Sequence, residues 1–236
     1  MNNIVNCKTC ETTSCLIKHS GEKWLEKLSQ VKNSPIYPKG QFIFMEGSLV
    51  MGAYFILKGK VKVISSSVDG KEHTVRLAKE GHLLGHTAIG VEKYTIGAVT
   101  LTEAQICFID NKSLQAAFME NPQFTFEVMR FYSRELRKSE IRTKCLSMMN
   151  NEEKVILGLL YIADTYLPNP EDNQVEINLS RQEIAQIIGT NSEQVSRVLS
   201  TMKKDGLIES KERAILLNDI QKLKAAISHY AFATEY

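Results

Sequence analysis

The pattern of apolar and polar positions changes twice along the chain. Between about residues 36 and 110, short segments rich in Val, Ile, Phe and Thr alternate with glycines, as in "AYFILKGKVKVISSS" and "TIGAVTLTEAQICFID". Segments of this kind are typical of strands, and Asp69–Gly70 between two of them is a strong hairpin signal. This part of the chain predicts a small antiparallel barrel or roll.

From about residue 112 to 148 the pattern becomes helical. Asn121–Pro122 can start a long helix, because the next 26 residues contain neither Gly nor Pro. Apolar side chains recur there at three- and four-residue steps, which indicates one buried stripe. The stripe comprises Phe124, Val128, Phe131, Tyr132 and Leu136, and it continues with Ser139, Thr143 and Leu146. On pattern alone, a dimer seam and a helix packed on its own domain are equally compatible with it.

The segment "LSRQEIAQIIGTNSEQVSRVLSTMKKDGLI", residues 179–208, predicts a helix-turn-helix. Ser180 followed by Glu183 forms a capping box for the first helix. Gly189 then makes the turn, and Ser192 is expected to cap the second helix. The following "GLIESKERAILL", residues 206–217, is typical of a two-stranded wing.

The second of these helices presents a polar face with the chemistry that base edges need. Glu193, Ser196, Arg197 and Ser200 lie opposite its apolar face by the 3.6-residue period. Arg197 can donate two hydrogen bonds to a guanine, and Glu193 can accept from a cytosine amino group. Further residues are expected to contact phosphates, namely Arg181, Gln182, Thr190 and Asn191, and Ser192 is also a candidate DNA-binding residue. The alternative is an ordinary helical hairpin with a solvated face, and spacing and turn chemistry favour DNA binding over it.

Length and composition narrow the class of protein. A chain of 236 residues with 43% hydrophobic and 24% charged residues is expected to fold into one large or two ordinary domains. Its apolar runs are too short to span a membrane, and its first residues lack the pattern of a signal peptide. We therefore expect a cytoplasmic protein, in which thiols stay reduced. The net charge of +2 is too small to indicate a partner.

Three of the five cysteines fall within nine residues, in "VNCKTCETTSCLIKH". They are Cys7, Cys10 and Cys15, and Cys107 and Cys145 lie far away in the sequence. An odd number of cysteines argues against a pure disulfide framework. The residue types allow a zinc site of four cysteines, a zinc site of three cysteines with His19, a pair of thiols that oxidises to a disulfide, or no cofactor at all.

The order of a β-roll, a long helix and a winged helix-turn-helix resembles the Crp–Fnr family of bacterial transcription regulators, over nearly the whole chain. The resemblance implies an α+β fold with a roll like the cyclic-nucleotide-binding jelly roll. The expected parts are a cysteine-rich segment (1–20), the roll (21–118), a dimerisation helix (119–149) and a DNA-binding domain (150–236). The family binds DNA as homodimers through the long helix, which favours the dimer seam.

The motif Glu-x-x-Ser-Arg, formed by Glu193, Ser196 and Arg197, resembles the Fnr branch of the family. This resemblance implies a TTGAT-like half-site in an inverted repeat of double-stranded DNA. It also implies RNA polymerase as a partner, through exposed roll loops near residues 48–53 and 66–72.

Fnr-type oxygen sensors hold a [4Fe–4S] cluster with N-terminal cysteines and one distant cysteine, four thiolates in all. The resemblance implies that Cys7, Cys10, Cys15 and Cys107 are these ligands. The spacing departs from the best-known pattern, since four residues and not five separate Cys10 from Cys15. Cys145, in the long helix, is interpreted as a small apolar residue. The signal would be oxygen or redox state.

Other ligands and functions are less favoured by the sequence. No Arg occurs between Arg76 and Arg130, so a buried cyclic phosphate would lack its usual partner and no cyclic nucleotide is expected. His82 and His86 offer a haem site as an alternative, although loop histidines are more often simply polar. No nucleophile motif, Walker loop or Gly-rich dinucleotide turn is present, so an enzyme is not expected.

Overall fold

A computed structural model describes residues 6–67, 69–85, 90–166, 174–211 and 214–230. The chain divides into two compact units, Met1–Arg134 and Glu135–Tyr236, which are described separately below. Within the described ranges, no helix is long and apolar enough to cross a membrane.

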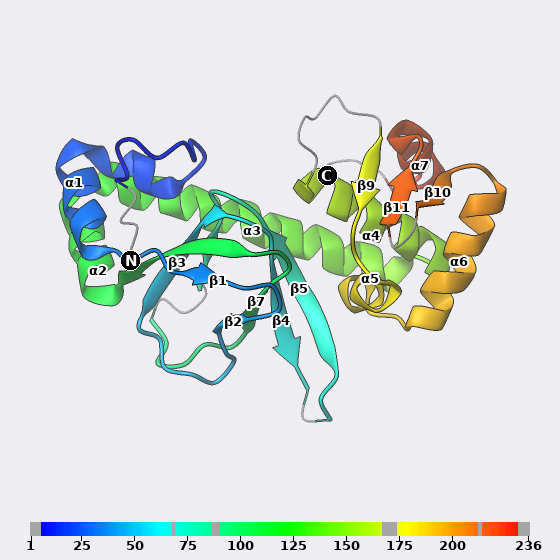
Figure 1. Ribbon diagram of the computed structural model, residues 1–236, viewed down its shortest axis with the longest axis horizontal. Coiled ribbons are helices and arrows are strands. Elements are labelled where there is room, and N and C mark those ends of the chain that lie inside the picture. The colour runs from blue at the N-terminus through cyan, green and yellow to red at the C-terminus, as the bar shows by residue number, and fades with distance from the viewer. Residues whose placement is uncertain (1–5, 68, 86–89, 167–173, 212–213, 231–236) are drawn as a thin grey trace. The chain divides into compact units, whose positions relative to one another are not determined.

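The first unit is built on a roll of two four-stranded antiparallel sheets, as expected (Figure 1). One sheet has the order β1-β8-β3-β6 and comprises β1 (Ile36–Tyr37), β8 (Ala104–Asp110), β3 (Gly52–Lys58) and β6 (Leu83–Leu84). The other has the order β2-β7-β4-β5 and comprises β2 (Phe42–Phe44), β7 (Gly97–Thr100), β4 (Val61–Ser66) and β5 (Glu72–Ala78). The β4–β5 hairpin turns at Gly70, whose φ of 79° confirms the predicted turn.

Side chains from both sheets fill the interior of the roll. The rings of Phe44 and Tyr94 stack with their centroids 4.3 Å apart, and Phe44 also stacks on Tyr54 at 5.1 Å. The Tyr94 hydroxyl donates a hydrogen bond to the carbonyl oxygen of Gly52 (2.6 Å), so its polar end is satisfied in the core.

A second core lies outside the roll, where helices cover the β3–β8 side (Figure 1). The helices before and after the roll are η1 (Leu16–Ser20), α1 (Gly21–Val31) and α2 (Asn111–Glu120). Helix α1 was not expected from the sequence, and it buries Trp24 and Leu28, four residues apart, against this core. Asp110 caps α2 by accepting hydrogen bonds from the backbone and hydroxyl of Ser113.

Helix α3 (Pro122–Met148) begins where the sequence predicted, and the Asn121 side chain accepts from the amide of Phe124. Phe124, Val128 and Phe131 are at most 8% exposed and pack in the second core of their own unit. Within one chain these three side chains therefore face their own core, and their assignment to a dimer seam stays a prediction. The apolar stripe of this half of α3 is the inward face of the helix.

The outward face of α3 carries a different set of apolar side chains. Phe126, Met129 and Leu136 are 55–61% exposed. Of the other predicted seam residues, Ser139 and Thr143 are exposed, while Tyr132 and Leu146 are partly buried. The sequence interpretation missed Phe126 and Met129, because it followed the stronger of two overlapping apolar stripes.

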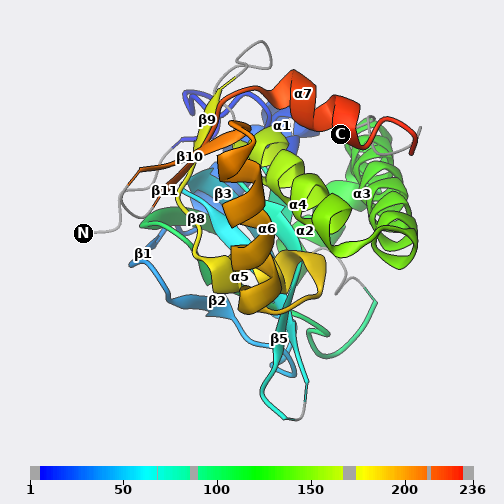
Figure 2. The same cartoon turned by 90° about the vertical axis from the view of Figure 1, so that its right-hand side faces the viewer.

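The second unit contains four helices after α3 and a small sheet within its described residues (Figure 2). They are α4 (Asn151–Tyr166), α5 (Arg181–Ile188), α6 (Ser192–Lys204) and α7 (Ile220–Ala226), with the strands β9 (Val175–Ile177), β10 (Ile208–Lys211) and β11 (Ala214–Leu217). Asn150 begins α4 with a capping box, since it exchanges hydrogen bonds with Glu153. The β10–β11 wing is confirmed, and β9 adds a third strand that was not expected.

Gly158 lets α4 and α5 approach each other closely. A Cβ at this position would lie 2.4 Å from Cγ2 of the buried Ile188, so Ile188 or the helices must shift. We expect Gly158→Ala to destabilise the protein by about 1–2 kcal/mol in urea unfolding, because overpacking outweighs the gain in helix propensity. In an Ile188→Ala background the clash is absent, and the same change should be neutral or stabilising. Equal effects in both backgrounds would contradict this account.

Candidate cofactor pocket and nucleic-acid interface

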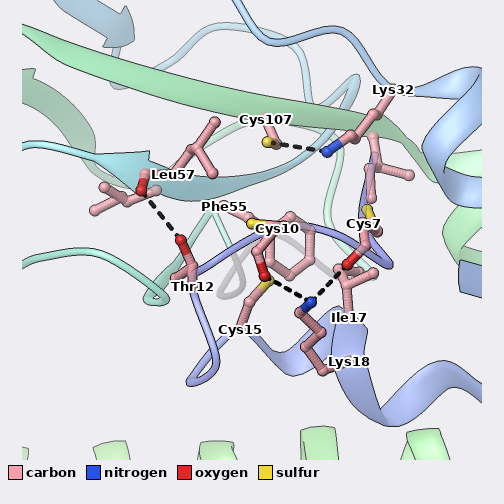
Figure 3. Close-up of a pocket in the computed structure, with 12 residues that line it drawn as sticks. Cys7, Cys10, Thr12, Cys15, Ile17, Lys18, Lys32, Phe55, Leu57 and Cys107 are labelled. Atoms are coloured by element: carbon pink, nitrogen blue, oxygen red, sulfur yellow. Dashed lines mark hydrogen bonds between the residues drawn. The ribbon is translucent and has the colours of Figure 1, made fainter. Parts of the chain in front are cut away.

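Four cysteines line one pocket of the first unit (Figure 3). Cys7, Cys10 and Cys15 come from the N-terminal segment, whereas Cys107 lies on β8 opposite Phe55 of β3. Cys7 and Cys107 are buried, and Cys10 and Cys15 are partly exposed. The remaining wall is largely apolar and includes Ile17, Phe55 and Ile109. The fold thus brings the three N-terminal thiols together with Cys107, which is far from them in the sequence.

Hydrogen bonds hold the N-terminal segment against the roll. The Thr12 hydroxyl donates to the carbonyl oxygen of Leu57 on β3 (3.2 Å). Lys18 donates from Nζ to the carbonyl oxygens of Cys7 (2.6 Å) and Cys10 (2.8 Å), as Figure 3 shows. The amide of Cys7 donates to the hydroxyl of Ser29 on α1 (2.8 Å). These contacts tie the cysteine loop, residues 7–15, to β3, η1 and α1.

Loss of the Lys18 ammonium should loosen this loop. Hydrogen bonds to a charged group contribute about 1.5–3 kcal/mol each, so we expect Lys18→Met to raise the population of the open loop by roughly tenfold or more. The measurement is the rate at which Cys7 is alkylated in the cofactor-free protein, followed by mass spectrometry. Lys8→Met is the matched control, because the side chain of Lys8 forms an exposed ion pair with Glu26 and does not line the pocket. Equal alkylation rates in the two variants would contradict the expectation.

The four thiols influence one another electrostatically. Burial raises the pKa of the Cys15 thiol to about 12, although the residue as a whole is partly exposed. A backbone hydrogen bond from Ile17 lowers this pKa, while Cys107, Cys7 and Cys10 raise it further. The thiols are therefore close enough for a negative charge on one to disfavour charge on the others, and a positive ligand would favour all four as thiolates.

Lys32 and Ser34 also contact Cys107, and the sequence interpretation missed both. Lys32 donates from Nζ to Sγ of Cys107 (3.6 Å), and the Ser34 hydroxyl lies 3.3 Å from the same sulfur. Burial lowers the pKa of Lys32, but Cys107 and Cys7 outweigh this effect, so that its pKa is raised. No sequence motif marks these residues, because their contact with Cys107 depends on how the chain folds back onto β8.

The thiols do not form a ready metal site. Among the described residues, no group of three or more His, Cys, Asp or Glu side chains is arranged to hold a metal ion. His19 is not one of the residues that line the pocket, so the pocket lends no support to the three-cysteine zinc site with His19. Cys145 is fully buried in the second unit, as expected for a small apolar residue. Of the alternative haem ligands, His82 is partly buried and His86 lies outside the described residues.

Helices α5 and α6 form the predicted helix-turn-helix (Figure 2). The Ser180–Glu183 capping box is present at the start of α5, and Gly189 ends it in the left-handed conformation, with φ 66° and ψ 41°. Asn191, and not Ser192, caps α6, since its side chain accepts from the amide of Gln194 (2.9 Å). Ser192 is instead the first residue of the helix.

The polar face of α6 is exposed. Glu193, Ser196, Arg197 and Ser200 are all exposed, while Val195, Leu199 and Met202 are buried on the opposite face. The Ser196 hydroxyl donates to the carbonyl oxygen of Ser192 and the Ser200 hydroxyl to that of Ser196, both at 2.8 Å. In this arrangement the hydroxyls of the two serines can only accept a hydrogen bond from a base.

The residues expected at phosphates lie around the turn and the start of α5. Gln182 and Asn191 are exposed, and Arg181 and Thr190 are partly exposed. Asn191 uses its side-chain oxygen for the helix cap, which leaves its amide nitrogen for a phosphate.

Two family models match the chain in the order of its two units. Residues 36–121 match the cyclic nucleotide-binding domain, and residues 153–226 match the Crp-like helix-turn-helix domain.

Two relatives and a solved structure align with most of the chain. The chain is 26% identical over 223 residues to the "Transcriptional activator protein Anr" of Pseudomonas protegens, in an alignment that covers 93% of this chain and 91% of that protein. It is 25% identical over 190 residues to the "CRP-like cAMP-activated global transcriptional regulator" of Mycobacterium tuberculosis, with coverage of 79% and 84%. The solved structure of FixK2 from Bradyrhizobium japonicum has the same fold, with a TM-score of 0.73, 22% identity and coverage of 83% and 96%.

The two matched domains, their order and the geometry of α5 and α6 agree with one another. The relatives named above are transcriptional regulators and not enzymes. The chain belongs to the Crp–Fnr family of DNA-binding transcriptional regulators.

Proposed function

We propose that this regulator senses oxygen or redox state through a [4Fe–4S] cluster held by Cys7, Cys10, Cys15 and Cys107. The observation that carries the proposal is the convergence of these four thiols, from the N-terminal segment and from β8, on one pocket. Four thiolates are the ligand set that such a cluster takes. When bound, the cluster would supply a group whose integrity depends on oxygen.

The pocket suits this group in three respects. Its wall is largely apolar, which limits access of water to the ligands. The cysteine loop is held by backbone and side-chain hydrogen bonds, but its ends are not crosslinked, so the sulfurs can be drawn together during assembly. A buried ammonium, that of Lys32, stands beside two of the thiols. A structural zinc ion is the competing occupant and is one outcome of the test below.

The pocket also has a physical connection to α3. Cys7 and Cys107 belong to the same core as Phe124, Val128 and Phe131 of α3. A close-packed core transmits displacement, because its side chains cannot shift singly. Cluster assembly would therefore favour one position of α3, and cluster loss would release it.

We further propose that the protein acts as a homodimer on a TTGAT-like inverted repeat. The exposed apolar residues Phe126, Met129 and Leu136 supply the partner-facing side of α3. A two-fold dimer would present two α6 helices to successive major grooves. Contact with RNA polymerase is a further proposal, for which the roll loop at 48–53 offers the exposed side chains of Leu49 and Met51.

The test is to purify the protein without oxygen and to measure iron, acid-labile sulfide and zinc per chain. We expect iron and sulfide in near-equal amounts and a broad visible absorbance that is lost when air is admitted. Affinity for a duplex with the inverted repeat should fall with the absorbance, while affinity for a scrambled duplex should stay the same. Zinc alone, or no metal after anaerobic reconstitution, would overturn the cluster proposal, and equal operator affinity before and after air would overturn the coupling.

A further inference from the structure

Lys32 is a charged side chain in an unusual place. It is 4% exposed, and it is the one charged residue among the described residues that is buried to this degree. Lysine is almost never fully buried unless it is paired. Its neighbours in the pocket are the thiols of Cys107 and Cys7, neither of which is a carboxylate. Within the described part of the chain, Lys32 thus forms no ion pair with a carboxylate, the usual partner of a buried ammonium.

The backbone around Lys32 fixes this position. The Lys32 amide donates to the carbonyl oxygen of Leu28 and so ends α1. The next residue, Asn33, exchanges two backbone hydrogen bonds with Phe108, which follows Cys107 on β8 (3.3 and 2.9 Å). This strand-like pairing places the backbone of Lys32 beside Cys107. The position of the Lys32 side chain in the pocket is therefore fixed by the fold.

A thiolate-ligated group in the pocket would provide the negative charge that pairs with the Lys32 ammonium. Four thiolates bring four negative charges into a largely apolar site, and the iron or metal they bind compensates only part of them. A fixed positive charge within contact of the sulfurs stabilises that excess of negative charge. Figure 3 shows the Lys32 amine directed at Cys107, on the side of the pocket opposite Lys18.

We propose that Lys32 is the counter-charge of the four-cysteine ligand set and that it tunes how readily the bound group is reduced or lost in air. This inference rests on the proposed thiolate-bound group. A positive charge beside the sulfurs favours the form with more electrons, so it raises the reduction potential and slows oxidation. Lys32 is a positioning and tuning residue and is not itself a ligand.

The first experiment compares wild type, Lys32→Met and Lys27→Met after anaerobic purification. Lys27 is the matched control, because it is an exposed lysine on the neighbouring α1. We expect Lys32→Met to lower the reduction potential by about 59 mV, the equivalent of a tenfold change for one electron. Its visible absorbance should be lost in air severalfold faster than that of wild type. Lys32→Arg, which keeps the charge, should restore both values at least in part.

Stability separates this role from a structural one. Replacing a buried ammonium by a methionine of similar shape should leave the cofactor-free protein as stable as wild type or more stable in thermal unfolding. If Lys32→Met does not fold, Lys32→Gln serves as the neutral variant. A variant that is less stable but has an unchanged potential would mean that Lys32 is only structural, and would overturn the proposal.

A second experiment does not depend on iron. The cofactor-free chain is titrated with Co²⁺, whose charge-transfer absorbance reports thiolate ligation. We expect Lys32→Met to weaken Co²⁺ binding by about tenfold or more, and Lys27→Met to leave it unchanged. If wild type binds Co²⁺ with this dependence but holds no iron and sulfide, the cluster proposal fails and the role of Lys32 stands. If wild type holds the cluster and Lys32→Met matches it in every measurement, the role of Lys32 fails alone. If wild type binds neither, both are overturned.

Discussion

Replacing Arg197 by alanine is expected to weaken specific binding to the inverted repeat by roughly 30-fold or more. A bidentate arginine–guanine pair contributes about 1–3 kcal/mol of discrimination, and a dimer on two half-sites loses two such pairs. Arg197 is exposed on the polar face of α6, so its loss removes no core contact. The measurement is the dissociation constant for the repeat and for a scrambled duplex at the same salt concentration.

Two variants distinguish base reading from charge. Arg197→Lys keeps the charge but loses the forked pair of donors, so it should lose nearly as much specificity as Arg197→Ala. Lys204→Ala removes a charge from the last turn of the same helix, and we expect it to change the affinity for both duplexes by the same factor. If Arg197→Ala weakens binding to both duplexes equally, Arg197 contacts phosphate, and the proposed guanine contact is wrong.

Replacing Cys107 by serine is expected to abolish cluster incorporation, with iron and sulfide falling from the wild-type amount to near zero. Cys107 is the one ligand candidate on the roll itself, and the other three lie on the N-terminal segment. Without it, a cluster would tie no part of that segment to β8, so operator binding should also become insensitive to air. The measurements are iron and sulfide per chain and operator affinity with and without oxygen.

Cys145→Ser is the matched control, because it removes a buried thiol that lies outside the pocket. It should retain the wild-type content of iron and sulfide. Circular dichroism of both variants shows whether the fold is kept. A folded Cys107→Ser protein with a full complement of iron and sulfide would exclude Cys107 as a ligand.

The DNA-binding unit was largely predictable from the sequence, because its signals are local. Ser180 and Glu183 are three residues apart, Gly189 meets the demand for a left-handed turn within the motif, and the buried and exposed faces of α6 follow from helical period alone. The predicted cap of α6, Ser192, is one residue away from the observed cap, Asn191, because both residue types cap helices well.

Helix α3 shows where such reasoning stops. Its length and start were predicted, because a run without Gly or Pro after Asn121–Pro122 is a local property. Which of its two apolar stripes faces inward depends on the core beside it. The stripe of Phe124, Val128 and Phe131 packs on that core, and the stripe of Phe126 and Met129 is left exposed. The spacing of apolar residues along a helix does not show which face of the helix has a core beside it.

The sequence by itself determined the fold class, the helix-turn-helix and the four cysteines as a candidate ligand set, because each depends on short-range spacing or on a resemblance carried by such spacing. The tertiary structure decided that the four thiols share a pocket and that Lys32 lies buried beside Cys107. The pairing of Asn33 with Phe108 and the contact of Thr12 with Leu57 join parts of the chain that are distant in sequence. Residues that are distant in sequence come together only when the chain folds. The structure was therefore needed to identify Lys32 as the charged residue beside the thiols.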